Sequence, residues 1–216
     1  MGQSAAQARR QREKDERKGA ILKAARELFF EKGTGRATVD DIAARAEISK
    51  GTIYLYFESR ETILAHLLLE GLGILLERLE EAYCAGRAMP AARRLRRLAT
   101  AYLTFFEEYP DYFRLLMAFD RGQLASRVPP DIYDQVLTDS QHGFDFVVRA
   151  VQQGVDDGDF VTQHPRRTAA ALWAALNGTV MLLGHPLRRT IVGAELPRLY
   201  QETLRLSLKG MARPGS

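Results

Sequence analysis

The chain of 216 residues is poor in the residues that build disulfides and metal sites. It contains one cysteine, Cys84, and four histidines that are scattered along the sequence. A single cysteine excludes an internal disulfide bond, which is typical of cytoplasmic proteins. None of these residues has the spacing of a metal-ligand pair. We therefore expect a cytoplasmic protein without a metal or another cofactor.

Long apolar stretches are also missing. No apolar run approaches the roughly 20 residues that a helix needs to cross a bilayer, and the first 18 residues lack the apolar core of a signal peptide. Glycine-rich phosphate-binding loops are absent, the carboxylates form no clear pair, and Cys84 has no evident catalytic partner. These absences argue against a membrane protein and against an enzyme. A small helical enzyme stays open as an alternative that requires one of the histidines to meet a partner in the fold: His66, His142, His164 or His185.

Hydrophobic residues make up 46% of the chain, which is enough for a sizeable core. They recur at spacings of three and four, no segment alternates with a period of two for long, and no internal repeat is visible. The sequence therefore predicts an all-α protein. Helices are expected over 16–32, 59–83, 90–108, 110–120, 130–153, 165–183 and 194–211, with two short helices within 38–57.

The most informative stretch is 38–57, TVDDIAARAEISKGTIYLYF. Thr38 and Asp41 form a capping-box pattern at the start of its first short helix. Apolar residues then follow at i, i+3, i+4 and i+7, which gives this helix one buried face: Val39, Ile42, Ala43 and Ala46. Glu47 and Ile48 form the break between the two helices.

Ser49 is the expected N-cap of the second short helix. Ile53 and Phe57, four residues apart, are expected to face a core, while the polar and aromatic residues between them face outward. A helix this short is not stable alone. Its exposed surface is explained if the pair of helices is a helix-turn-helix that places the second helix in the major groove of DNA.

With these residues the chain resembles the TetR family of bacterial transcriptional regulators. The resemblance runs from Ile21 to Leu64, through an amphipathic helix that ends at Gly33, TVDDIAARAEIS, KGTIYLYF and ESRETIL. It implies a ligand-responsive regulator, a repressor that binds a palindromic operator in double-stranded DNA as a homodimer. Glu47 departs from the family, which often has glycine in the turn, so this residue must tolerate an unusual backbone angle or change the turn.

The resemblance also implies which positions meet DNA: Thr38, Ser49, Lys50, Gly51, Thr52, Tyr54, Tyr56 and Arg60. Thr38 and Arg60 match positions at helix N-termini, where backbone N–H groups favour phosphate. For Tyr54 and Tyr56 the alternative is that one of them only packs the small domain. For Lys50 the alternative is a solvated surface charge.

The charge distribution agrees with a DNA-binding N-terminal region. Residues 1–60 carry 13 Lys and Arg against 9 Asp and Glu, a difference of +4 that equals the formal net charge of the whole chain. A phosphate-binding surface predicts such an asymmetry. The first 15 residues are either a flexible basic tail of no consequence or an arm that reaches the minor groove through Arg9, Arg10 and Arg12.

These expectations divide the chain into a flexible basic tail (1–15), a helix-turn-helix domain (16–58) and a larger helical-bundle domain (59–216). The helix that begins after Ser59 has some 25 residues and spans roughly 35 Å. It is expected to link the DNA-reading unit to the larger domain. Bound ligand would shift the population between two dimer geometries, of which one fits the operator.

The larger domain is rich in aromatic residues at helical spacing, which is typical both of plain core packing and of an apolar ligand cavity. The resemblance favours a cavity for a small apolar or amphipathic effector. Its candidate lining is Tyr102, Phe105, Phe106, Tyr109, Phe113, Met117, Phe144, Trp173, Asn177 and Met181. Without such a cavity, the protein would be a ligand-independent DNA-binding dimer.

The last helices carry small and apolar residues at spacings of three and four, which permit close helix approach. Their candidate dimer interface is Ala170, Ala174, Gly178, Leu196, Leu199, Thr203 and Leu206. The alternative is burial of these residues within one subunit. A two-fold dimer would present two recognition helices about 34 Å apart, one turn of DNA.

Overall fold

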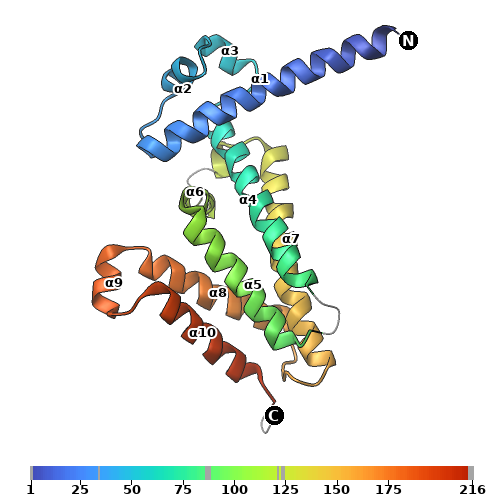
Figure 1. The fold of residues 1–216 in the computed structure, drawn as a ribbon, viewed down its shortest axis with the longest axis vertical. Helices are drawn as coiled ribbons and strands as arrows, with labels where there is room; N and C mark the ends of the chain where they lie inside the picture. The colour runs from blue at the N-terminus through green and yellow to red at the C-terminus, as the bar shows by residue number, and fades with distance from the viewer. Residues whose placement is uncertain (1, 34, 86–88, 121, 123–124, 214–216) are drawn as a thin grey trace. The chain divides into compact units, whose positions relative to one another are not determined.

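The computed structural model describes residues 2–33, 35–85, 89–120, 122 and 125–213. Within these ranges the chain is almost entirely helical and contains no β-strand beyond one isolated antiparallel bridge between Phe160 and Ala212. The helices are α1 (Gly2–Lys32), α2 (Val39–Arg45), α3 (Lys50–Tyr54), α4 (Arg60–Cys84), α5 (Ala91–Glu108), α6 (Pro110–Asp120), the 3-10 turn η1 (Ala125–Arg127), α7 (Pro130–Asp156), α8 (Pro165–Leu183), α9 (Pro186–Val192) and α10 (Leu196–Met211) (Figure 1). The all-α prediction is confirmed.

The helices form two compact units whose boundaries do not follow the sequence order. The first unit comprises Met1–Gly71 and Asp111–Leu137, and the second comprises Leu72–Pro110 and Thr138–Ser216. The expected boundary near residue 58 is therefore replaced by one that passes through α4 and α7, which contribute residues to both units.

Contacts of Tyr112 explain why α6 belongs to the first unit. Its ring packs edge-on against Phe30 of α1, with the ring centroids 5.2 Å apart. It also lies against the backbone of Gly71 in α4, where an added Cβ would come within 2.8 Å of the ring. Only glycine allows this approach of α6 to α4. These contacts join residues far apart in the sequence, so no local sequence pattern predicts them.

Helix α1 is longer than predicted, because it begins at Gly2 where we expected a flexible tail over 1–15. The segment contains no proline and is rich in strong helix formers such as Ala, Gln, Arg and Glu. An i,i+4 ion pair between Arg9 and Glu13, 2.9 Å long, adds support. The buried stripe starts only at Ile21, and the helix ends before Gly33 with φ +80°, as predicted for its C-cap.

The second unit is built around buried residues of α5, α8 and α10. The side chain of Tyr200 is fully buried, and its hydroxyl donates to the carbonyl of Ala99 at 2.9 Å. Arg94 is buried as well; its Nε donates to Gln153 at 2.9 Å, and its guanidinium lies over the ring of Tyr83. A buried cation with such partners ties α4, α5 and α7 together.

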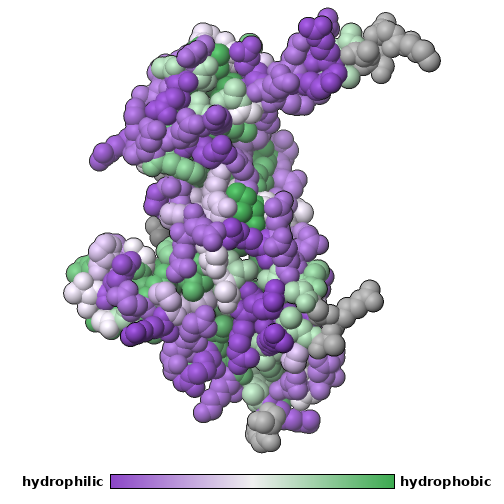
Figure 2. Space-filling view, in the orientation of Figure 1, coloured by the Kyte–Doolittle hydropathy of each residue, from purple (hydrophilic) through white to green (hydrophobic). Residues whose placement is uncertain are grey.

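Helix α9 was not predicted. It starts with Pro186 and ends before Gly193, whose φ of +65° suits a glycine at the helix C-terminus. None of its residues is buried, and Leu187, Ile191 and Val192 are exposed; hydrophobic colours gather over this helix in Figure 2. In the described ranges no single helix is long and apolar enough to cross a membrane, although α8 and α9, bent by 106°, pass that test as a pair.

Candidate nucleic-acid interface

The start of α2 is held by the predicted capping box. Thr38 Oγ1 accepts the backbone N–H of Asp41 at 3.1 Å, and Asp41 Oδ2 accepts the backbone N–H of Thr38 at 2.9 Å. Lys32 donates to the other carboxylate oxygen at 2.9 Å. The backbone N–H of Thr38, then Lys32, hold the pKa of Asp41 well below its usual range. An ionised Asp41 also complements the positive N-terminal end of α2.

The turn between α2 and α3 places Glu47 in the left-handed region, with φ 54°. This confirms the unusual backbone angle that the missing glycine predicts. The turn is closed by the N–H of Ala46 donating to Ile42 at 2.9 Å and that of Ile48 donating to Ala43 at 3.0 Å. The side chain of Glu47 is exposed. The left-handed conformation is therefore imposed by the backbone of the turn and not by contacts of the side chain.

Helix α3 is short and is held by its neighbours. Ser49 caps it, as predicted, by accepting the N–H of Thr52 at 3.1 Å. Ile53 and Phe57 are buried and anchor the opposite side. The outward residues form what we call the α3 surface: Lys50, Gly51, Thr52, Tyr54, Leu55 and Tyr56. Thr52 and Tyr56 are half-buried, and the other four are exposed.

Leu55 is the member of the α3 surface that sequence reasoning missed. It is 79% exposed, beside Tyr54 at 48%. Its position two residues after Ile53 and two before Phe57 places it on the side opposite the buried pair, so the helical period does point to it. A leucine this exposed in a small helix next to two tyrosines is a candidate apolar contact to thymine methyl groups.

Two of the predicted DNA-contacting residues, Lys50 and Arg60, already have partners within the chain. Lys50 forms an ion pair with Asp40, with Nζ and Oδ2 2.8 Å apart, and this contact raises the pKa of Lys50. Both side chains are exposed, and an exposed pair contributes little, so phosphate can compete with Asp40. Arg60 is different: its Nε donates to the carbonyl of Ala37 at 2.8 Å, and its guanidinium lies over the ring of Phe29. The structure therefore gives Arg60 packing contacts inside the first unit, and its contact with phosphate stays a prediction.

His66 joins α1, α4 and the segment after α3. Its Nδ1 donates to the carbonyl of Thr62 at 2.9 Å, so Nε2 accepts from Lys18 Nζ at 2.8 Å. The imidazole also packs edge-on against Phe57, with centroids 5.2 Å apart. Burial first, and Lys18 in addition, lower the pKa of His66, while the Thr62 carbonyl and Asp131 oppose that shift. A neutral His66 thus supports the residue that anchors the α3 surface.

The predicted effector residues do not all fall in one unit. Phe113 and Met117 are buried in the first unit, whereas the other eight lie in the second. Some of these eight meet: the Tyr102 hydroxyl donates to Asn177 Oδ1 at 2.9 Å, Phe144 packs against Trp173, and Phe105 stacks on Tyr109. Phe106 is half-buried on the same helix as Tyr102.

Helices α8 and α10 present an outer face of small and apolar residues. Ala170, Ala174 and Gly178 are exposed on α8, and Leu206 is 55% exposed on α10. Leu199 and Thr203 are half-buried, and Thr203 lies within hydrogen-bond distance of Thr179, 3.2 Å between the hydroxyl oxygens.

Two of the predicted roles on α8 and α10 need correction. Leu196 is 8% exposed because it packs inside its own subunit, so it is not available to a partner. Met181 is 41% exposed and lies three residues after Gly178, on the outer face instead of in a cavity.

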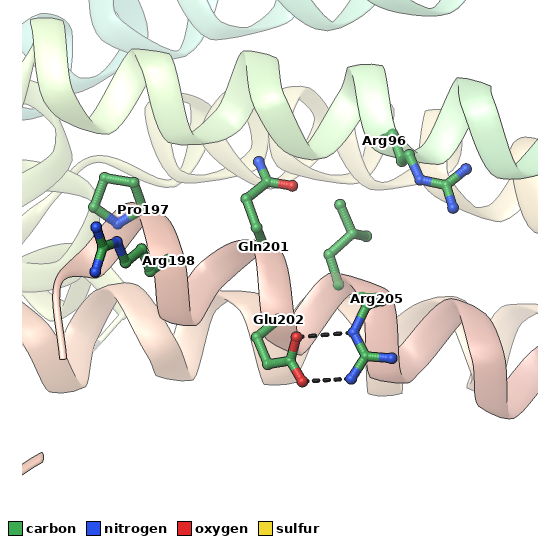
Figure 3. Close-up of a pocket in the computed structure, with 7 residues that line it drawn as sticks. Arg96, Pro197, Arg198, Gln201, Glu202 and Arg205 are labelled. Atoms are coloured by element: carbon green, nitrogen blue, oxygen red, sulfur yellow. Dashed lines mark hydrogen bonds and ion pairs between the residues drawn. The ribbon is translucent and has the colours of Figure 1, made fainter.

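A groove between α5 and α10 was not predicted. It is lined by Arg96, Pro197, Arg198, Gln201, Glu202, Leu204 and Arg205 (Figure 3). Arg205 and Glu202 are paired within it, with contacts of 2.8 and 2.5 Å that raise the pKa of the arginine and lower that of the glutamate. None of the ten predicted effector residues lines this groove.

Two short helices joined by a tight turn, of which the second, α3, is capped and faces outward, define a helix-turn-helix DNA-binding protein. The model of the tetR family of bacterial regulatory proteins matches residues 21–67, and that of the Tetracyclin repressor-like C-terminal domain matches residues 95–191. The chain belongs to the TetR family of bacterial transcriptional regulators.

Individual relatives agree with this assignment. The chain is 44% identical over 61 residues to the fatty acid metabolism regulator protein of Bacillus subtilis (strain 168) and 30% identical over 139 residues to the HTH-type transcriptional activator FasR of Mycolicibacterium smegmatis. These matches cover 28% and 63% of this chain, and they span only 31% and 61% of the relatives' own lengths.

Solved structures share the fold. FadR from Bacillus subtilis in complex with stearoyl-CoA has a TM-score of 0.65 at 21% identity, over 89% of this chain and 98% of FadR. PfmR from Thermus thermophilus has a TM-score of 0.68 at 24% identity, over 89% of this chain and 99% of PfmR.

Replacing Glu47 by glycine should raise the free energy of unfolding by about 0.5 to 1 kcal/mol. Glycine removes the left-handed penalty of a side chain, partly offset by its greater freedom in the unfolded chain. The matched control is Ala46→Gly, at a residue with an ordinary φ of −85°, which should lower stability. Urea unfolding measures both, and equal destabilisation by the two changes would contradict the assigned strain.

The lowered pKa of His66 predicts a loss of stability in mild acid. Below pH 6.5 the unfolded chain binds a proton that the folded chain resists, so stability falls as the pH drops from there through the native pKa of His66. Protonation would also place a second cation beside Lys18. In His66→Gln the drop between about pH 7.5 and 5 should be smaller, which thermal unfolding at a series of pH values measures. An unchanged drop would show that other groups cause it.

Proposed function

We propose that the protein regulates transcription by binding a palindromic operator as a homodimer, and that a small apolar or amphipathic effector releases it. The observation that carries this proposal is the α3 surface, an exposed polar and aromatic face on a helix whose opposite side is buried in its own subunit. Ile53 and Phe57 are buried, while Tyr54 and Leu55 are left in solvent. Adjacent exposed apolar and aromatic side chains on one face mark a candidate interaction site.

Duplex DNA is the partner that fits. The major groove is about 12 Å wide and admits one helix. Ser49 and the first N–H groups of α3 would approach phosphate, Lys50 would exchange Asp40 for phosphate, and Tyr54, Leu55 and Tyr56 would face the base edges. Thr38, which caps α2, would present the N-terminal end of that helix to a neighbouring phosphate.

The outer face of α8 and α10 supports a homodimer. Ala170, Ala174 and Gly178 allow a second copy to approach closely, and Leu206 and Met181 offer apolar area. A closed two-fold dimer repeats the α3 surface once, which matches a palindromic operator with half-sites one DNA turn apart.

For the effector, the aromatic helices of the second unit and the relatives point in the same direction. FadR, a structural neighbour, was solved with stearoyl-CoA, and the Bacillus subtilis relative is named for fatty acid metabolism. We infer a long-chain acyl compound as the first effector to test, with Tyr102, Phe144 and Asn177 among its contacts. Helix α4, which contributes residues to both units, would pass the effect to the DNA-binding unit.

Selection of bound sequences from a random duplex pool tests the function directly. We expect two inverted half-sites with centres about 10 base pairs apart. On the selected operator, Tyr56→Ala should weaken binding roughly 10-fold or more without a matching loss of stability, whereas Lys209→Ala, at an exposed position of α10, should leave it unchanged. Mobility-shift assays at fixed salt measure this; no enriched sequence, or equal affinities, would refute the proposal.

Replacing Gly178 by glutamate should separate the dimer without harming the subunit. An added Cβ at Gly178 meets nothing within 4 Å in its own chain, and glutamate is a better helix former by roughly 0.5 to 1 kcal/mol. A charge there would block close approach of a second copy. Gly73→Glu is the matched control, since an added Cβ there also meets nothing within 4 Å and this half-buried residue lies on α4. Sedimentation should show a monomer for Gly178→Glu only; a dimer for both would exclude this face.

A further inference from the structure

The N-terminal half of α1 is a charged helix that its own chain does not cover. Side chains from Ala6 to Arg17 are all exposed, and this part of the helix extends past α2 and α3 in Figure 1 and is almost wholly hydrophilic in Figure 2. From Gly2 to Ala20 the sequence has no apolar side chain larger than alanine. Such a helix has nothing to insert into a membrane or into an apolar protein groove.

Three of its basic residues lie on one side of the helix. Arg10, Lys14 and Arg17 recur at i, i+4 and i+7 and therefore share one face, which we call the basic stripe. In the part of the chain that the structure describes, these three side chains have no ion pair or hydrogen bond. The remaining charges are partly satisfied within the helix, since Arg9 pairs with Glu13 and Gln11 donates to Asp15 at 2.8 Å.

The exposed half of α1 begins close to the α3 surface. Lys18, the residue after the stripe, lies with its Nζ 5.6 Å from the ring centroid of Phe57 and 2.8 Å from His66 Nε2. Phe57 directly follows Tyr56. The 16 residues from Gly2 to Arg17 extend about 24 Å from that point, the length of about seven base pairs.

We propose that the basic stripe binds the phosphate backbone of duplex DNA that flanks the operator half-site. The inference rests on the proposed operator binding and extends it. Three unpaired cations along one helix face complement a row of phosphates, and like charges four residues apart destabilise the helix until anions neutralise them. A helix about 10–12 Å in diameter does not enter a minor groove about 6 Å wide, so the stripe follows the backbone and does not read bases.

The test compares wild type with Arg10→Gln/Lys14→Gln/Arg17→Gln on two duplexes that carry the selected operator. One duplex ends at the half-sites, and the other extends at least ten base pairs beyond each. The control, Arg93→Gln/Arg188→Gln/Lys209→Gln, removes the same charge from exposed residues of the second unit. Circular dichroism and thermal unfolding check that all three chains fold alike.

On the long duplex, wild type and the control should bind more tightly than on the short one, with a steeper dependence of log affinity on log salt. The stripe variant should lose this difference, with a slope lower by up to about 5 for the six contacts of a dimer.

Equal slopes and equal length dependence in wild type and the stripe variant would overturn the proposal while leaving operator binding intact. An equal loss in the control would overturn it too, since net charge alone would then explain the effect. Loss of binding to anionic phospholipid vesicles in the stripe variant, with its DNA slope unchanged, would assign the stripe to a lipid surface instead. Failure of the wild type to bind any operator would refute the proposed function itself.

Discussion

Burial of Ile53 and Phe57 is the interaction on which the α3 surface depends. An isolated helix of five residues is not stable in water, because the free-energy cost of nucleating a helix exceeds the stabilisation from its few hydrogen bonds. The two apolar side chains, fully enclosed in the first unit, keep α3 helical and also decide which of its sides faces solvent. The cap at Ser49 and the turn at Glu47 then set the direction in which the helix begins.

The environment of Phe57 links this small helix to the rest of its unit. Lys18 of α1 and His66 of α4 contact the same ring, and they also bond to each other. A change in α4 therefore acts directly on the residue behind the α3 surface. For the proposed effector, these contacts offer a physical route from α4 to the α3 surface.

Helix α4 also connects the two units of the chain. Its first half belongs to the DNA-binding unit and its second half to the other unit, and α6 joins the first unit although it follows α5 in sequence. The chain thus crosses between units three times. The proposed effector would therefore touch residues of the DNA-binding unit itself if it contacted α6 or the part of α7 up to Leu137.

Local signals in the sequence determined the helix-turn-helix. The capping box at Thr38 and Asp41, the cap at Ser49 and the buried pair Ile53 and Phe57 each arise between residues close in sequence, where helical period and side-chain chemistry act directly. Tertiary structure alone decided that Arg60 packs on Phe29, that Leu196 is internal, that Tyr112 draws α6 onto Gly71, and that the predicted effector residues fall in two units. The physical reason is the same in each case: these outcomes depend on which surfaces meet across long stretches of chain, and apolar periodicity says that a helix face is buried but not what buries it.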